Sequence, residues 1–284
     1  MIDRRGPDLS ETPPSSRRAD RDPDVAAARG AARDGVGALH NLANLLRSLR
    51  VGAKPLARAI VDVRDGCGTL RAAFVSLRAV VAGRQPPSTR AAAEVLFDGA
   101  VEAIDALSGA LGRADANAID ARARLSVEVV VRRAGAELDG VLCLADLLVA
   151  AGSPSAVSLD LADVVRLRLC GPRTASATVV VTLEPGDYTF VGDPVVAASL
   201  LEVALASVAR PRAAGLRLRA ERTEAGRLWV SARPDDQRKA DRAALTLTIG
   251  APVAAAQDVA RAVARAVGAD FDVETGGRAA RVLL

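Results

Sequence analysis

Aromatic residues are scarce in this chain. Tryptophan and tyrosine occur once each and phenylalanine four times among 284 residues. The positive charge comes almost wholly from arginine, and no clustered basic stretch is interleaved with aromatic side chains that could stack on bases. We therefore expect no binding of nucleic acid. The cores are expected to consist mainly of alanine, valine and leucine.

Cysteine is also rare, and histidine occurs only once. Cys67, Cys143 and Cys170 form no CxxC pair and have no histidine-rich companion, so we expect no zinc or other metal site. This spacing is typical of reduced thiols, which favours a cytoplasmic protein. No uncharged apolar run reaches the roughly 18 residues of a membrane span. Asp146 interrupts the best candidate, so no membrane insertion is expected.

The first half of the chain contains a polar tail followed by a long helical pattern. Residues 1–24 balance acids and bases, contain proline and carry almost nothing to bury, which predicts a disordered tail. Residues 25–151 have helical periodicity, which predicts a helical bundle. Its four expected helices span about 25–50, 55–83, 88–112 and 117–151. The motif DGCG at 65–68 is expected to interrupt the second of them.

Strand and helix patterns alternate over residues 157–284, after a linker rich in glycine, proline and serine. Asp160 and Asp193 stand where they are expected to cap helices, and Gly268 is expected to close the last helix. Residues 177–192 predict two strands joined by a Pro-Gly turn. The expected fold class is α+β: a helical bundle, then an α/β sandwich with a mostly antiparallel sheet and helices on one face.

The only histidine lies in GALHNLANLL, residues 37–46. On a helix, one apolar arc is formed by Leu39, Leu42, Ala43, Leu46 and Leu49. His40 falls just outside one edge of this arc, and Asn44 lies next to it one turn along. A side chain at the border of a packed seam is anchored by its neighbours while its ring stays accessible to a partner. His40 is therefore the candidate reactive residue.

The string HNLANLL resembles the H-box of two-component histidine kinases and histidine phosphotransferases, which reads H-[DE]-L-x-N-L-L. In that family the histidine lies on the first helix of a dimeric hairpin and a ring nitrogen carries the phosphoryl group, which implies that His40 is the phosphoacceptor. The family's acidic neighbour orients the ring, whereas this chain has the neutral Asn41. Asn44 stands where the family positions water for dephosphorylating the partner. Arg47 and Ser48 are expected to touch that partner.

The resemblance continues over about residues 137–284. FVGDPVVAASLLEVALASVA is similar to the V-x-G-D-P stretch and N-box helix of the kinases' ATPase domain, which has the GHKL or Bergerat fold. However, Val203 and Ser207 replace the N-box asparagines, and valine has no oxygen to offer Mg²⁺. RPDDQRKA replaces D-x-G-x-G, and only Gly250 remains of the glycine-rich phosphate loop. We therefore expect a degenerate domain that binds no ATP and no Mg²⁺.

Three functional hypotheses remain open. The leading one is a histidine-kinase-like phosphotransfer protein that is not ATP-competent, in which His40 exchanges a phosphoryl group with the receiver domain of a response regulator.

 The chain is then a degenerate histidine kinase or a histidine phosphotransferase of a phosphorelay. The second hypothesis is a non-enzymatic pseudokinase that serves as an interaction or scaffold module. The third is an active histidine kinase with a divergent nucleotide site. The resemblance and the hydrophobic seam both imply a homodimer formed through the bundle.

Overall fold

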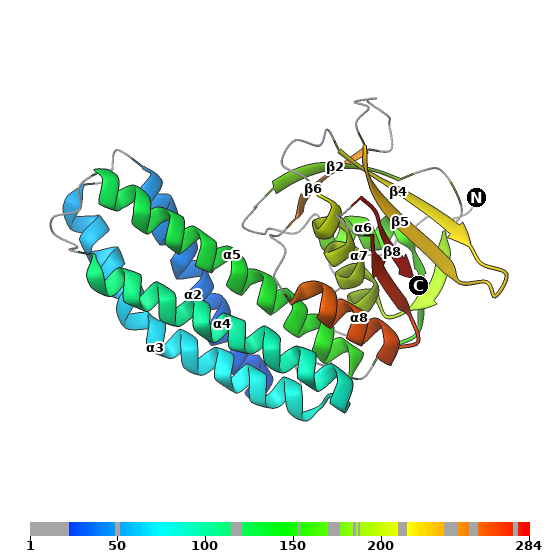
Figure 1. Ribbon diagram of the computed structural model, residues 1–284, viewed down its shortest axis with the longest axis horizontal. Helices are drawn as coiled ribbons and strands as arrows, with labels where there is room; N and C mark the ends of the chain where they lie inside the picture. The colour runs from blue at the N-terminus through cyan, green and yellow to red at the C-terminus, as the bar shows by residue number, and fades with distance from the viewer. Residues whose placement is uncertain are drawn as a thin grey trace, which may run out of the picture.

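The protein has an α+β fold with an N-terminal helical region and a mixed sheet, as seen in a computed structural model (Figure 1). The structure describes residues 23–48, 52–114, 121–152, 154–169, 177–183, 186, 188–209, 215–235, 244–249, 255–274 and 278–284. Most of the tail expected at 1–24 lies outside these residues. Its last two residues, Pro23 and Asp24, already belong to the first described helix, so the helical pattern begins slightly earlier than expected.

Four long helices form the N-terminal region. They are α2 (Pro23–Arg47), α3 (Ala53–Gly83), α4 (Pro87–Arg113) and α5 (Ala121–Ala151). The four helical segments expected from the periodicity are thereby confirmed to within about four residues at each end. The expected interruption at 65–68 is wrong, because α3 runs through DGCG without a break. Gly66 and Gly68 lie on open sides of this helix, so neither marks a close approach or a turn.

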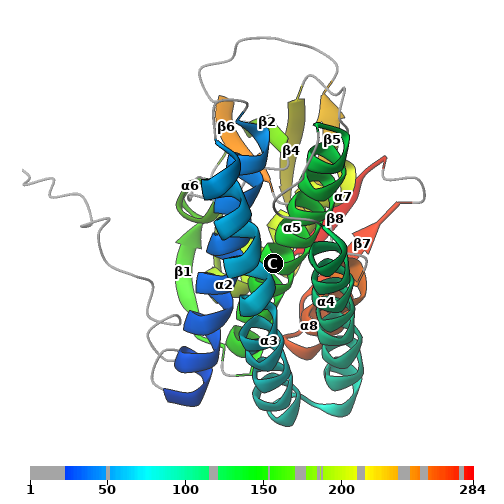
Figure 2. The same cartoon turned by 90° about the vertical axis from the view of Figure 1, so that its left-hand side faces the viewer.

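The four helices close a bundle within one chain. Helix α2 packs against α3 and α5, and α4 packs against the same two helices (Figure 2). Gly35 of α2 allows a close approach to α3, since a Cβ atom there would lie 2.6 Å from Leu70 Cδ1. Leu39, Leu42 and Leu46, the seam that suggested a homodimer, are buried in this intrachain core. The seam therefore has a partner without a second copy of the chain.

Eight strands follow the bundle in the described part of the chain. They are β1 (Val157–Asp160), β2 (Ala177–Leu183), β3 (Thr189–Gly192), β4 (Gly215–Arg222), β5 (Leu228–Asp235), β6 (Ala244–Ile249), β7 (Asp270–Val273) and β8 (Ala280–Leu283). Six of them form a sheet of order β6-β2-β4-β5-β8-β7, in which only β2 and β4 run parallel. The two strands expected over 177–192 are present, but they do not pair with each other. Strand β3 pairs with β1 in a separate two-stranded sheet.

Three helices lie between the six-stranded sheet and the bundle (Figure 1). They are α6 (Leu161–Leu169), α7 (Pro194–Val208) and α8 (Ala256–Ala266). The predicted caps are confirmed: Asp160 Oδ1 accepts the backbone N–H of Ala162 at 2.8 Å, and Asp193 Oδ1 accepts that of Val195 at 2.8 Å. Gly268 has a φ of +71° just after α8, a conformation that glycine adopts without strain.

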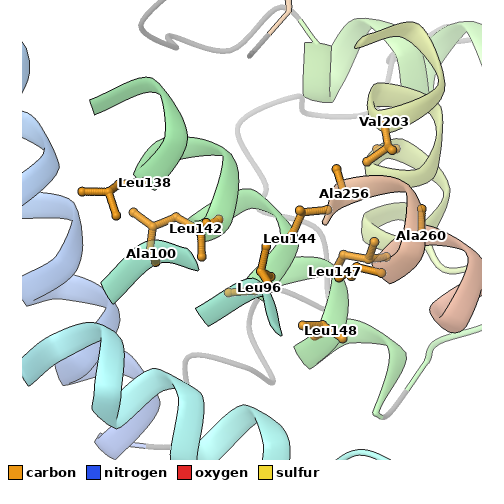
Figure 3. Packing of buried hydrophobic residues seen from close by; sticks show 14 of the residues in the cluster. Leu96, Ala100, Leu138, Leu142, Leu144, Leu147, Leu148, Val203, Ala256 and Ala260 are labelled. Carbon is orange, nitrogen blue, oxygen red and sulfur yellow. The ribbon is translucent and has the colours of Figure 1, made fainter. Parts of the chain in front are cut away.

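The bundle and the sheet region share one hydrophobic core. Leu144 and Leu147 of α5 point toward the side of α7 and α8, where they lie near the small side chains of Ala256 and Ala260 (Figure 3). Helix α5 thus packs against both the other bundle helices and the helices of the sheet region. None of the described helices combines the length and the apolar character that crossing a membrane requires.

Candidate functional site

His40 lies on α2 at the edge that faces α5. Its ring is half-buried, as expected for a residue bordering the apolar arc. Four members of that arc are buried, while Leu49 lies outside the described residues. The ring rests against Gly135 of α5, where an added Cβ atom would lie 3.2 Å from His40 Cε1 and 3.4 Å from Nδ1. Glycine at position 135 therefore leaves the space that the imidazole occupies.

Polar contacts fix α5 beside α2 on both sides of this point. Arg29 donates to Asp146 Oδ2 at 2.7 Å, about three helical turns before His40. Arg47 lies 3.5 Å from Glu128 Oε1, about two turns after it. These pairs and the contact of His40 with Gly135 share one antiparallel register. The histidine thus sits on a helix pair whose relative position is set by ionic contacts as well as by the core.

Arg124 of α5 caps the C-terminal end of α2. Its guanidinium donates to the carbonyl oxygens of Leu46 at 2.6 Å and Leu45 at 2.8 Å, and also to that of Ser48. The last carbonyls of a helix have no partner within the helix, so an arginine at this end stabilises it. This cap stabilises the end of α2 about two turns after His40.

The partial burial of His40 favours the neutral imidazole. Partial burial lowers the pKa of His40, and the nearby negative charge of Asp139 on α5 opposes that shift. A neutral imidazole has a free lone pair on one ring nitrogen, which is the form that attacks phosphorus. The site therefore favours the nucleophilic form of His40 at neutral pH.

The other residues expected at the site surround the histidine unequally. Asn44 is exposed one turn along, next to the α5 side, and Asn41 is exposed on a different side of α2. Arg47 is exposed but its guanidinium pairs with Glu128, and Ser48 is half-buried at the capped end of α2. The structure thus brings Asn44 and Arg47 to the α5 side of α2 together with His40.

Two exposed apolar side chains near this edge were not predicted from the sequence. Leu125 and Val129 of α5 are 61% and 59% exposed, although both are large hydrophobic residues. They lie on the outer side of α5 next to Arg124 and Glu128, the residues that contact the end of α2. The sequence contained the signal, since both residues fall outside the periodic core positions of α5. An accessible imidazole therefore lies on the same pair of helices as an exposed apolar pair.

The N-box positions are filled by protein packing. Val203 is 7% exposed and points toward Ala256 of α8 (Figure 3). Ser207 Oγ donates to the carbonyl of Val203 at 2.8 Å and accepts from Gln257 Nε2 of α8 at 3.2 Å. Both positions thus contact α8 rather than an open site. The loop segment around Gly250 and residues 236–240 of RPDDQRKA lie outside the described residues.

A cavity of about 610 Å³ opens elsewhere, at the beginning of α7. Its polar lining includes Asp193, which caps α7 and also accepts the Ser155 hydroxyl at 2.9 Å. Arg222, on the opposite side, donates to the carbonyls of Thr189 and Gly226. These groups are used by the protein itself. No group of three or more metal-binding side chains lies together anywhere in the described part of the chain.

The outer face of the sheet gathers charges that the sequence pattern did not reveal. Arg217, Arg219, Arg233 and Arg281 line one hollow with Trp229, because alternate residues of β4, β5 and β8 share this face. Arg219 pairs with Glu221 at 2.7 Å, and Arg281 lies 3.7 Å from Glu274. The acidic partners reduce the positive charge of the face.

Comparisons with known proteins give no indication of what this site does. No model of a protein family matches this chain, and no curated protein matches it either.

Proposed function

We propose that the protein is a phosphotransfer protein of a two-component phosphorelay, in which His40 accepts a phosphoryl group from an aspartyl phosphate and passes it on. The observation that carries this proposal is the position of the only imidazole, half-exposed at the edge of a rigid helix pair. Positioning of the nucleophile is the main requirement of phosphoryl transfer, because little covalent chemistry is left to the protein.

The reaction needs a donor but no oxidant or reductant. The lone pair of a neutral His40 nitrogen attacks phosphorus, the N–P bond forms, and the O–P bond of the acyl phosphate breaks. The electron pair of the broken bond returns to the carboxylate of the donor. The receiver domain of a response regulator is the proposed donor and acceptor, since it brings its own acidic, Mg²⁺-binding site.

The packing of the N-box positions supports a transfer that does not start from ATP. Val203 is buried against α8 and Ser207 is hydrogen-bonded to Gln257, so neither is placed to hold a phosphate-bound metal ion. We propose that the sheet region is a degenerate GHKL-type domain and serves as a packing partner of the bundle. A divergent but active kinase would require a different nucleotide site.

A single chain is proposed to carry the complete site. Helices α3 and α4 pack on the sides of α2 and α5 where a second hairpin would otherwise lie. The homodimer expected from the resemblance is therefore unnecessary for building the site. Light scattering combined with size-exclusion chromatography measures the oligomeric state. We expect the mass of one chain. A dimer whose dissociation abolishes labelling of His40 would contradict this part of the proposal.

The exposed pair Leu125 and Val129 favours a second candidate, a non-enzymatic interaction module. Such a module would use the same surface to hold a signalling protein without being phosphorylated. Exposed hydrophobic residues at one place mark protein contacts in either case. The two candidates differ in whether His40 becomes labelled.

Radiolabelled phosphoryl transfer distinguishes the candidates. The wild type and His40→Ala are incubated with a panel of phosphorylated receiver domains and, separately, with labelled Mg²⁺-ATP. We expect acid-labile, base-stable label from a receiver in the wild type only, with unchanged circular dichroism of the variant. Label from ATP would support the divergent kinase. Binding of a receiver without any label would overturn the proposal in favour of the interaction module.

A further inference from the structure

Asp139 lies on the α5 edge that faces α2. Three contacts, Arg29 with Asp146, His40 with Gly135 and Arg47 with Glu128, define the antiparallel register of the two helices. In this register Asp139 lies one turn beyond Gly135 and opposite the turn of α2 that precedes His40.

The direction of side chains in helices brings the two groups together. Side chains lean toward the N-terminus of their own helix. His40 therefore leans along α2 toward the turn that faces Asp139. Asp139 leans along the antiparallel α5 toward Gly135, where the His40 ring lies. The carboxylate and the imidazole converge in the space between these two turns.

The orientation of the ring agrees with this arrangement. The Cε1 and Nδ1 atoms of His40 are its closest atoms to the Cβ position of Gly135, so the edge that carries Nδ1 faces α5. The other ring nitrogen, Nε2, is not among the three atoms nearest to that position. We infer that Asp139 is a positioning residue that orients His40 for phosphoryl transfer, in place of the acidic neighbour that position 41 lacks; this inference rests on the proposed function.

The role of the carboxylate follows from the charge on the ring. When Nε2 attacks phosphorus, the Nδ1 proton remains on a ring that becomes positively charged until that proton leaves. A carboxylate on the Nδ1 side stabilises this charge and favours the tautomer with its lone pair on Nε2. The field of Asp139 acts in this sense, because it raises the pKa of His40 against the effect of burial.

The other charged groups along this edge are engaged with one another. They are Arg29, Arg33, Arg47, Glu128, Arg132 and Asp146. Glu128 pairs with both Arg47 and Arg132, and Asp146 pairs with Arg29 and lies 3.9 Å from Arg33. On its other edge, α2 packs through Gly35 against the apolar Leu70 of α3. Asp139 is thus the acidic group that acts on the imidazole from across the helix pair.

Two variants of the full chain test the inference. Asp139→Asn removes the charge and keeps the shape of the side chain. Glu137→Gln removes the same charge from the same helix, but from a side about 160° away around it. Because His40 is the only histidine, its ring resonances in NMR and its phosphorylated form are assigned without ambiguity. Asp139→Glu, which keeps a carboxylate on a longer stem, serves as the rescue variant.

Each variant is measured in three ways. The first is the pH titration of His40 by NMR. The second is phosphorylation by potassium phosphoramidate, a small donor whose P–N bond breaks as ammonia leaves. The third is phosphorylation by a labelled receiver domain. We expect Asp139→Asn to lower the pKa of His40, move the acid limb of the rate profile to lower pH and reduce the plateau rate roughly tenfold with both donors. Glu137→Gln is expected to match the wild type, and Asp139→Glu to recover part of the rate.

The outcomes separate this inference from the proposed function. Wild-type titration and rates in Asp139→Asn, or equal losses in Glu137→Gln, would overturn the inference while labelling of the wild type by a receiver still supported phosphotransfer. The opposite result is a His40 titration and phosphoramidate rate that depend on Asp139 while no receiver labels the wild type. That result would support the pairing of Asp139 with His40 and contradict the proposed function.

Discussion

In the bundle, His40, which resembles the reactive histidine of two-component kinases, lies half-exposed, whereas in the sheet region the two residues aligned with the N-box are in contact with a neighbouring helix. His40 rests on a glycine that leaves room for its ring, and the surface around it is open on one side. Val203 is buried against α8, and Ser207 is hydrogen-bonded to that helix. The same chain thus keeps an accessible imidazole in one region, whereas in the other region Val203 and Ser207 are in contact with α8.

This difference teaches where chemistry is to be expected. A side chain that reacts with a partner must remain accessible, and burial of its neighbours only fixes its position. Val203 has no oxygen to offer a metal ion, and the Ser207 hydroxyl is hydrogen-bonded within the protein. The bundle is therefore the region in which we look for activity, and the sheet region is the one in which we look for stability.

The largest effect is expected where the two regions meet. Leu147→Ala removes a fully buried side chain of α5 that faces α8, so we expect the free energy of unfolding to fall by about 2–5 kcal/mol. Urea unfolding is followed by the fluorescence of Trp229, the only tryptophan, which reports on the sheet, and by helical circular dichroism, dominated by the bundle. Because the core is continuous, both probes should give one transition.

Leu125→Ala is the matched control for this prediction. It makes the same substitution on the same helix at an exposed position, and we expect a change within about 0.5 kcal/mol. Two separate transitions in the wild type would contradict the shared core, as would an equal loss in both variants.

A smaller loss of stability is expected when asparagines are placed at the two positions aligned with the N-box. The double variant Val203→Asn and Ser207→Asn would bury an amide beside Ala256, at a cost of about 1–3 kcal/mol in the free energy of unfolding. We expect no saturable Mg²⁺-ATP binding in calorimetry, because the positions remain packed against α8. The single variant Ser207→Asn, at a half-buried position, should cost less. Saturable binding by the double variant would show that only the ligands, and not the space, were missing.

The glycines of the bundle provide a finer comparison. Gly66→Ala, on an open side of α3, should stabilise the protein by about 0.5–1 kcal/mol through helix propensity. Gly135→Ala offers the same gain but places a Cβ atom 3.2 Å from His40 Cε1, so the ring must shift. We expect a smaller gain in stability and a slower reaction of His40 with phosphoramidate. A rate equal to that of Gly66→Ala would contradict the role of Gly135 as clearance for the imidazole.

The smallest effect is a pH dependence of stability. Burial lowers the pKa of His40 in the folded protein below its ordinary value of 6.5, so the unfolded chain binds a proton more readily. Stability is therefore lost as the pH falls through 6.5 toward the lower folded value. Urea unfolding at several pH values should show this loss in the wild type and not in His40→Gln. A wild type that gains stability relative to the variant on acidification would mean that Asp139 outweighs burial.

Much of the local structure followed from the sequence. The helices of the bundle, the caps at Asp160 and Asp193, and the turn after α8 at Gly268 were predicted because periodicity and capping act within a few residues. The position of His40 at the border of an apolar arc followed in the same way, since it depends only on residues of its own helix.

Contacts between distant segments could not be predicted in that way. Nothing local indicated that β3 pairs with β1 rather than with β2, or that glycines at 65–68 continue a helix. The place of Gly135 and Asp139 beside His40 depends on the register of α2 against α5, which the paired charges and the shared core set together.

The sequence by itself thus determined which segments are helices and that its one histidine lies at the edge of a packed face. Only the tertiary structure decided that the bundle closes within one chain, that Val203 and Ser207 are in contact with α8, and which residues of α5 face the imidazole. The physical reason is that periodicity and capping are properties of neighbouring residues, whereas packing partners and register are chosen by the free energy of the whole core.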